Sequence, residues 1–191
     1  MYTSTLKTEY TETIRPALQK ELGVKNVMQV PKIEKIVVNA GMGSYLQKMN
    51  SKDYSFVVEN IERITGQKAV VKHAKLSVSN FKLREGQPVG VMVTLRGDKA
   101  YNFLAKLIHV TLPRVRDFRG IKTNIFDKSG NCSFGFPDHT VFPEGIMPED
   151  ARKTFGFQIT VCTSANDEKS AKALMTSLGF PFKKLKNNPA A

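Results

Sequence analysis

The chain has 191 residues, 41% of them hydrophobic, and this length suits one sizeable hydrophobic core. Its 29 Lys and Arg residues outnumber its 17 Asp and Glu residues, so the formal charge is +12 and the pI is near 9.7. This excess favours polyanionic partners, and nucleic acid is the first to consider. No stretch approaches the ~20 apolar residues of a membrane-spanning helix, no basic amphipathic helix stands out, and the first ten residues lack a signal-peptide core. We therefore expect a single cytoplasmic domain over residues 1–191 with no membrane partner.

The first elements in chain order are two helices and the strand between them. Apolar residues four apart predict a helix over residues 6–22, bent at Pro16 and ended by Gly23. The run "IEKIVVN" predicts a strand over residues 33–39. A second helical stripe covers residues 54–65.

Two strands flank a long connection in the middle of the chain. We expect strands over residues 69–73 and 89–95, then a helix that Asp98 can cap and that Pro113 stops.

The last elements are a strand over residues 154–162 and a helix from about residue 166 to residue 179. Because most strands are not separated by single helices, the fold class expected is α+β, a mainly antiparallel sheet with helices packed on one face.

Strand alternation divides the sheet into a core face and an open face. The expected core set is Ile36, Val38, Val89, Val91, Val93, Leu95, Phe155, Phe157, Ile159 and Val161. The expected open-face set is Lys35, Val37, Asn39, Gly90, Met92, Thr94, Arg96, Gln158 and Thr160. Amide and hydroxyl groups on such a face can read RNA 2'-hydroxyls and base edges, but an ordinary solvated face explains the pattern equally well.

Basic residues gather in two long segments and in the tail. Residues 68–86 and 106–128 carry many more cations than anions, and each includes a phenylalanine, Phe81 or Phe118. Cations with an interleaved aromatic ring suit phosphate contact and base stacking. Nucleic-acid binding is favoured over a merely solvated surface.

Metal and enzyme chemistry find little support. Cys132 and Cys162 have no metal-like spacing, and the three histidines are scattered, so we expect no metal and no cofactor. "NAGMGSYLQK" lacks the remaining residues of a P-loop or a dinucleotide fingerprint. His139 beside Asp138, with a distant cysteine, is a weak candidate triad because nothing positions the groups.

A binding-module alternative is the RNA recognition motif. "KTFGF" resembles part of the string whose exposed strand aromatics stack bases in that motif. Here Phe155 and Phe157 share the expected core face, so the resemblance is weak.

A set of longer strings carries a much more specific resemblance. "VMQVPKIEKIVVNAGMG", "ITGQKAVVKHAKLSVSNFKLREGQPVGVMVTLRG", "PRVRDFRGI", "VFPE" and "LGFPFKK" occur in that order between about residues 10 and 184. Together they closely resemble ribosomal protein five of the bacterial large subunit, the family that binds 5S rRNA.

The resemblance implies a structural, non-enzymatic component of the large ribosomal subunit that supports translation. The implied fold is an antiparallel sheet with its open face toward 5S rRNA in the central protuberance. The implied partners are 5S rRNA, 23S rRNA, peptidyl-site tRNA, neighbouring large-subunit proteins and a small-subunit head protein.

Three groups of residues follow from this resemblance. The expected 5S rRNA contacts are Lys35, Asn39, Gln67, Lys68, Thr94 and Arg96. The loop at about residues 73–88 is expected to touch tRNA through His73, Lys75, Ser77, Phe81, Lys82 and Arg84. The segment at about 114–136 is expected to form an intersubunit bridge through Arg114, Arg116, Arg119, Lys122 and Phe136, and residues 185–191 are expected to be a short flexible tail.

The sequence departs from the family pattern at a few places. Lys72 stands where Ser or Thr is usual, and Asn80 stands where glycine is usual; asparagine tolerates positive φ better than most residues. Pro137, Asp138 and His139 replace a more usual Arg-Glu run, and Gly145 stands where Ile is common. These changes leave the fold expectation intact but put the bridge contact in doubt.

Overall fold

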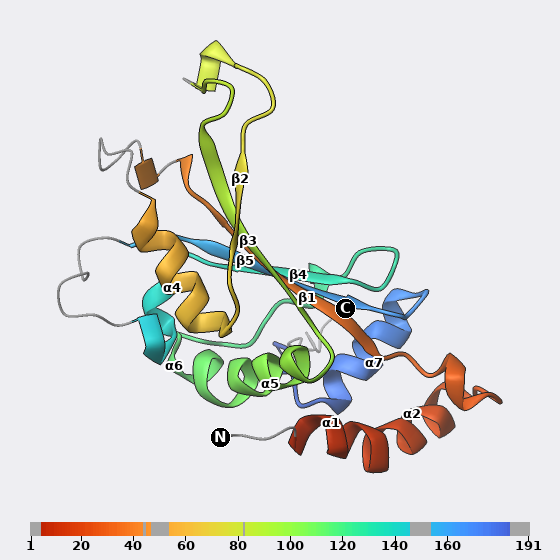
Figure 1. Ribbon diagram of the computed structural model, residues 1–191. Coiled ribbons are helices and arrows are strands. Elements are labelled where there is room, and N and C mark those ends of the chain that lie inside the picture. The colour runs from red at the N-terminus through yellow and green to blue at the C-terminus, as the bar shows by residue number, and fades with distance from the viewer. Residues whose placement is uncertain (1–4, 44, 47–53, 82, 146–153, 184–191) are drawn as a thin grey trace, which may run out of the picture.

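The computed structural model describes residues 5–43, 45–46, 54–81, 83–145 and 154–183. Its strands form one five-stranded antiparallel sheet in the order β2-β3-β1-β5-β4, and the labelled helices gather on one side of it (Figure 1). The strands are β1 (Ile33–Gly41), β2 (Val70–His73), β3 (Pro88–Arg96), β4 (Cys132–Phe136) and β5 (Phe157–Thr163). The α-helices are α1 (Thr5–Glu9), α2 (Arg15–Leu22), α4 (Ser55–Thr65), α5 (Asp98–Lys106), α6 (Leu112–Arg114) and α7 (Glu168–Ser177). The expected α+β fold is confirmed.

The first helix runs through Pro16 because a π-helical segment precedes it. α1, the π segment η1 (Tyr10–Ile14) and α2 follow one another, and Gly23 ends them at φ 64°. Proline has no N–H and crowds the carbonyl four residues back, so a locally wider turn removes the conflict. The Tyr10 hydroxyl donates to the Pro31 carbonyl at 2.8 Å, and burial raises the pKa of Tyr10 to about 12.

The same arrangement recurs in the middle of the chain and corrects one expectation. Pro113 was expected to stop the helix, and the helix ends one residue later: α5 continues through the π segment η4 (Leu107–Thr111) into α6, which contains Pro113 and ends at Arg114. Asp98 was expected to cap this helix. The N-cap is instead Gly97, without a side-chain cap, while Asp98 pairs with Lys7 of α1.

The strands bury the side chains that alternation predicted, with one partial exception. Ile36, Val38, Val91, Val93, Leu95, Phe155, Phe157, Ile159 and Val161 are buried. Val89, near the start of β3, is only half-buried. Against this face pack α4 and α7, whose buried residues include Val57, Ile61, Ile64, Ala171, Leu174 and Met175.

Strand β4 lies inside the segment 114–136 that was expected to be one extended loop. Cys132 and Phe136 are buried and Phe134 between them is half-buried, and the Phe136 ring stacks on Phe157 with centroids 5.3 Å apart. The turn before β4 is closed by Asp127, whose carboxylate accepts from the Ser129 and Asn131 amides. The loop therefore ends in an edge strand.

The segment after α7, residues 179–183, is here called the C-terminal strip, and it is hydrogen-bonded to the loop that precedes β4. This pairing is called the clamp. The Ile121 amide donates to the Pro181 carbonyl, and the Lys183 amide donates to the Ile121 carbonyl, each at 2.9 Å. Gly120 has φ 92°, and a Cβ there would lie 2.6 Å from the Lys183 nitrogen. The strings "RDFRGI" and "GFPFK" thus pair directly. Residues 185–191, the expected flexible tail, lie outside the described residues.

Candidate nucleic-acid interface

The face of the sheet away from the helices carries rows of neutral polar side chains. Asn39 on β1 pairs with Met92 on β3 and with Gln158 on β5. In the next row Val37 lies between Thr94 and Thr160. These side chains are exposed or half-buried, as expected for this face. Asn39 and Thr94 lie on diagonal positions of neighbouring strands, at roughly 7 to 8 Å, close enough to contact one ligand together.

Two cations face each other at one end of these rows. Lys35 of β1 pairs with Arg96 of β3, and among the described residues neither forms an ion pair. Like charges directly opposite on a sheet are destabilising. An anion such as a phosphate placed between them would remove that cost. The sequence placed both residues correctly on this face.

Gln67 forms a hydrogen bond that connects two segments of the protein. It lies in the turn between α4 and β2, and its Nε2 donates to the Thr94 carbonyl at 3.0 Å. The turn is also held by the Ala69 amide, which donates to Glu62 at 2.9 Å. The structure thus brings Gln67 next to Thr94, while Lys68 in the same turn is exposed.

Sequence reasoning missed one member of this surface, because it did not predict β4. Ser133 lies opposite Thr160, and their hydroxyl oxygens are 2.9 Å apart. The signal was present, since Cys132, Phe134 and Phe136 alternate with small residues. The segment 114–136 was instead assigned as one extended loop because the family resemblance implied it.

The connection between β2 and β3 is an ordered hairpin extension that projects away from the sheet (Figure 1). The Ala74 amide donates to the Gln87 carbonyl at 2.8 Å, and Val78 and Leu83 bond to each other in both directions. At the tip, Leu76 is 74% and Phe81 73% exposed.

The expected tRNA-contact residues are distributed along this hairpin extension. His73 ends β2 and is exposed, as are Lys75 and Arg84. Ser77 accepts a hydrogen bond from the Glu85 amide at 2.9 Å, so it also holds the loop together. Lys82 lies outside the described residues.

Most of the expected bridge residues are exposed, but one is not. Arg114, Arg116, Arg119 and Lys122 are exposed on the segment that the C-terminal strip clamps. Phe136 is only 7% exposed and belongs to the core, so it is removed from the expected bridge surface.

The structure accounts for some of the residues that depart from the family pattern. Lys72 is exposed on β2. Asn80 lies in the 3-10 turn η3 (Ser79–Phe81) and does not use positive φ, which in the described residues only Asp117 adopts without being glycine. His139 is buried with its ring 4.3 Å from Phe155, and a Cβ on Gly145 would lie 2.9 Å from the His139 carbonyl oxygen. The histidine and the glycine therefore fit each other.

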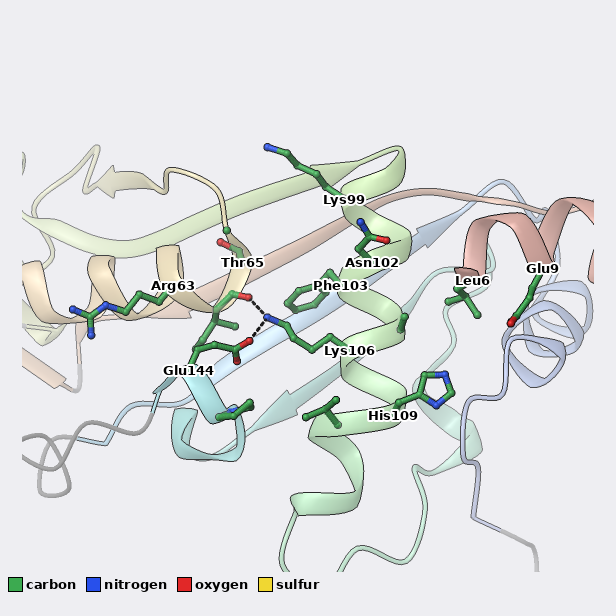
Figure 2. A pocket seen from close by; sticks show the side chains of 15 residues that line it. Leu6, Glu9, Arg63, Thr65, Lys99, Asn102, Phe103, Lys106, His109 and Glu144 are labelled. Atoms are coloured by element: carbon green, nitrogen blue, oxygen red, sulfur yellow. Dashed lines mark hydrogen bonds and ion pairs between the residues drawn. The ribbon is translucent and has the colours of Figure 1, made fainter. Parts of the chain in front are cut away.

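A groove of about 780 Å³ lies on the helical side of the molecule, between α4, α5 and the turn Pro143–Gly145 (Figure 2). Lys106, the cation at the centre of the groove, already has two partners within the protein. Its Nζ lies 3.0 Å from Glu144 and donates to the Ile64 carbonyl at 2.5 Å. Glu9 adds a second negative charge to the lining. Mixed charge and an internal ion pair distinguish this groove from the open face, whose central side chains are neutral and whose charged pair, Lys35 and Arg96, is entirely positive.

Among the described residues, the side chains considered for a metal site, a cysteine nucleophile or base stacking are not arranged for those roles. In the parts of the chain that the structure describes, no three His, Cys, Asp or Glu side chains could hold a metal ion. Burial raises the pKa of Cys132 to about 12, which suits an inert thiol rather than a nucleophile. Phe155 and Phe157 are both buried, so they cannot stack bases as in an RNA recognition motif. No described helix is long and apolar enough to cross a membrane.

A strongly basic α+β protein with an uncovered polar sheet face is typical of RNA-binding proteins. Family models match the chain over residues 26–84, as Ribosomal protein L5, and over residues 88–182, as the C-terminus of the same ribosomal protein family. The large ribosomal subunit protein uL5 of Acidobacterium capsulatum is 51% identical over 178 residues, which are 93% of this chain and 96% of that protein. Its counterpart in Desulfatibacillum aliphaticivorans is 48% identical, over 95% of this chain and 99% of that protein.

The chain belongs to the ribosomal protein L5 family. It is accordingly a structural component of the large ribosomal subunit and acts in translation, rather than as an enzyme.

Proposed function

We propose that the chain binds 5S rRNA through the open face of its sheet, within the central protuberance of the large subunit. The observation that carries this proposal is the pair of neutral hydrogen-bonding rows through Asn39 and Thr94, bordered by the facing cations Lys35 and Arg96. Neutral groups supply selectivity for RNA edges and riboses, and the cations supply phosphate contacts. Lys68 and Gln67 complete the surface beside Thr94.

The test is selection of RNA by the purified protein from total cellular RNA. The protein is expected to enrich 5S rRNA strongly over other RNAs of similar length. The double variant Asn39→Ala, Thr94→Ala should lose the enrichment, whereas Thr176→Ala, on the exposed side of α7, should keep it. Recovery of RNAs in proportion to their abundance would contradict the proposal.

We propose a second role for the β2–β3 hairpin extension, which is contact with peptidyl-site tRNA. Its exposed Phe81 and Leu76 provide an apolar tip, and the exposed His73, Lys75 and Arg84 provide phosphate-binding groups. Lys82, outside the described residues, belongs to the same proposal by its sequence alone. The internal hydrogen bonds pre-organise this tip before any partner arrives.

The hairpin role is tested by replacing residues 75–86 with a short Gly/Ser turn, which keeps the Ala74–Gln87 pairing at its base. Loop closure varies slowly with length, so this term changes the free energy of unfolding by roughly 1 kcal/mol or less. Binding of 5S rRNA should persist, while peptidyl-site tRNA should dissociate faster from ribosomes carrying the shortened protein. Equal dissociation rates would contradict the tRNA role, and loss of 5S rRNA binding would assign the loop to rRNA.

We further propose that the segment with Arg114, Arg116, Arg119 and Lys122 contacts a protein of the small-subunit head. Additional contacts with 23S rRNA and neighbouring large-subunit proteins complete the partner set. The expected result of Arg116→Gln with Arg119→Gln is weaker association of the two subunits without loss of 5S rRNA binding. Unchanged association in a subunit-joining assay would remove these residues from the bridge.

A further inference from the structure

The turn between α2 and β1 exposes apolar side chains that the proposed interface does not use. Here residues 25–29 are called the knuckle; they include the 3-10 turn η2 (Val27–Gln29). Met28 is 81% exposed and Val27 43% exposed, although Val30, directly after the knuckle, is buried. A single exposed apolar residue is ordinary in itself, but these two lie in a turn that is firmly held.

Hydrogen bonds hold the knuckle in one conformation. Asn26 Oδ1 accepts from the Met28 amide at 2.9 Å, and the Gln29 amide donates to the Asn26 carbonyl at 3.0 Å. From α2, the Arg15 guanidinium donates to the Val27 carbonyl at 3.1 Å and lies 3.5 Å from the Met28 sulfur. These bonds fix the backbone of the knuckle, and Arg15 also contacts the exposed thioether of Met28.

Further bonds fix the first residue of the knuckle, and the chain just after it, to the helical layer. Gln19 donates to the Lys25 carbonyl at 3.2 Å, and Tyr10 donates to the Pro31 carbonyl at 2.8 Å. A turn anchored in this way is pre-organised, so a partner that docks on it incurs little cost in backbone ordering.

The charges beside the knuckle are mainly positive. Lys25 lies within it and Lys32 follows it, and both are exposed. Lys20, on the last turn of α2, is exposed as well, and Glu21 is the single acidic residue between residues 15 and 32. Exposed apolar side chains on a turn among cations suit a polyanion that has a groove to receive them.

The knuckle is also well separated from the centre of the open face. Asn39 lies six residues along β1 from Ile33, which is roughly 20 Å at the rise of an extended strand, and the knuckle lies beyond Ile33. RNA held at Asn39 would therefore reach the knuckle only with a different part of its surface.

We propose that the knuckle is a second RNA-binding site, at which Met28 enters the minor groove of double-helical rRNA while Lys25, Lys32 and Lys20 contact the flanking phosphates. The minor groove of A-form RNA is wide and shallow, so a convex side chain can reach its sugar edges. Methionine adapts to an irregular surface through its flexible, polarisable side chain. This inference deepens the proposed function, because it gives the chain an rRNA contact separate from the sheet.

The direct test is photo-cross-linking within assembled large subunits. A benzophenone amino acid is introduced at position 28 and, in a separate protein, at position 70 on the exposed part of β2. Position 28 is expected to cross-link to a base-paired rRNA segment, located by reverse-transcription stops. Cross-linking from position 28 to a protein, to single-stranded RNA or to nothing would overturn the inference.

The second protein separates this inference from the proposed function. If position 70 cross-links to 5S rRNA and position 28 does not cross-link to RNA, only the knuckle site fails. If neither benzophenone-bearing protein enters the large subunit while the unmodified chain does, the knuckle site is tested by comparing the incorporation of Met28→Leu with that of Met28→Ser.

The decisive substitutions compete with the unmodified protein for incorporation into large subunits. Met28→Ser should be incorporated roughly tenfold less efficiently because the buried apolar contact is lost, while Met28→Leu should keep most of the efficiency. Lys25→Gln should weaken incorporation, and the matched change Lys169→Gln, at the start of α7, should not. Equal incorporation of Met28→Ser and the unmodified chain would overturn the proposal.

Discussion

Asn39 and Thr94 carry no charge, and this determines how their loss should appear in a binding measurement. Changing either residue to Ala should weaken 5S rRNA binding by roughly tenfold, because one hydrogen bond to RNA is lost and a polar RNA group is left unpaired. The slope of log affinity against log salt should stay the same, because a neutral side chain releases no counterions.

The matched control for these substitutions is Lys68→Gln in the neighbouring turn. It should lower the salt slope by about one, since one phosphate contact is lost. Filter binding or fluorescence titration over a series of salt concentrations measures both quantities. A changed slope for Asn39→Ala would mean that this residue acts through a neighbouring cation.

Asp127 supplies a pH-dependent contribution to stability. The Asn131 side chain and the Asn131 and Ser129 amides donate to its carboxylate, and these bonds hold the pKa of Asp127 below its usual value. A depressed folded-state pKa stabilises the fold above the usual pKa near 3.8, and this contribution is lost as pH falls through the folded-state value. Asp127→Asn should therefore lower the thermal midpoint at pH 7.

The same comparison repeated at falling pH checks the cause of that effect. The difference in midpoint between the two proteins should shrink below pH 3.8 and vanish once the carboxyl is protonated in the folded state. A difference that does not depend on pH would assign the effect of Asp127→Asn to turn geometry instead.

At the scale of elements, the clamp between residues 120–121 and the C-terminal strip connects two segments that are distant in sequence. Gly120→Ala would place a methyl group 2.6 Å from the Lys183 nitrogen at a φ of 92°, so the strip or the loop must move. We expect the free energy of unfolding to fall by roughly 1 to 3 kcal/mol.

Urea unfolding and amide hydrogen exchange measure this effect. Exchange should accelerate at Ile121 and Lys183, whose amides close the clamp. Gly43→Ala is the matched control, because a Cβ there meets nothing within 4 Å. Equal exchange at Ile121 in both variants would show that the loop is held elsewhere.

The spacing of apolar residues predicted most helices and strands, because the buried side chains recur with the period of a helix or of a strand. It failed where tertiary context decides. The helix after β3 passes through the π segment η4 before it ends beside Pro113, and Phe136 is buried because β4 joins the sheet edge. The π segment leaves no mark in composition or charge, whereas the alternation of Cys132, Phe134 and Phe136 with small residues was a local signal for β4.

The candidate interface was predictable to the same degree. Apolar and polar residues alternate along β1 and β3, and the apolar ones are buried. The alternation therefore predicted that the others share the open face, and among them are Lys35, Asn39, Thr94 and Arg96. It could not show that Gln67 donates to the Thr94 carbonyl or that "RDFRGI" pairs with the C-terminal strip. Such contacts between distant segments depend on the assembled fold.

At the scale of the whole molecule, the net charge of +12 should control how fast the protein finds RNA. The association rate with 5S rRNA should fall steeply between about 50 and 200 mM salt, because screening weakens electrostatic steering. Stopped-flow fluorescence measures this rate. An association rate that is independent of salt would show that a conformational step in the protein or the RNA limits binding.

The lengths of the strands bear on how the free protein avoids associating with itself before assembly. The edge strands β2 and β4 have four and five residues, whereas β1 and β3 between them have nine each and β5 has seven. Short edges present few unpaired backbone groups to another chain, and a lysine on β2, Lys72, further opposes edge-to-edge pairing. The short edge strands and Lys72 therefore limit the backbone groups through which a free copy could pair its sheet with that of another copy.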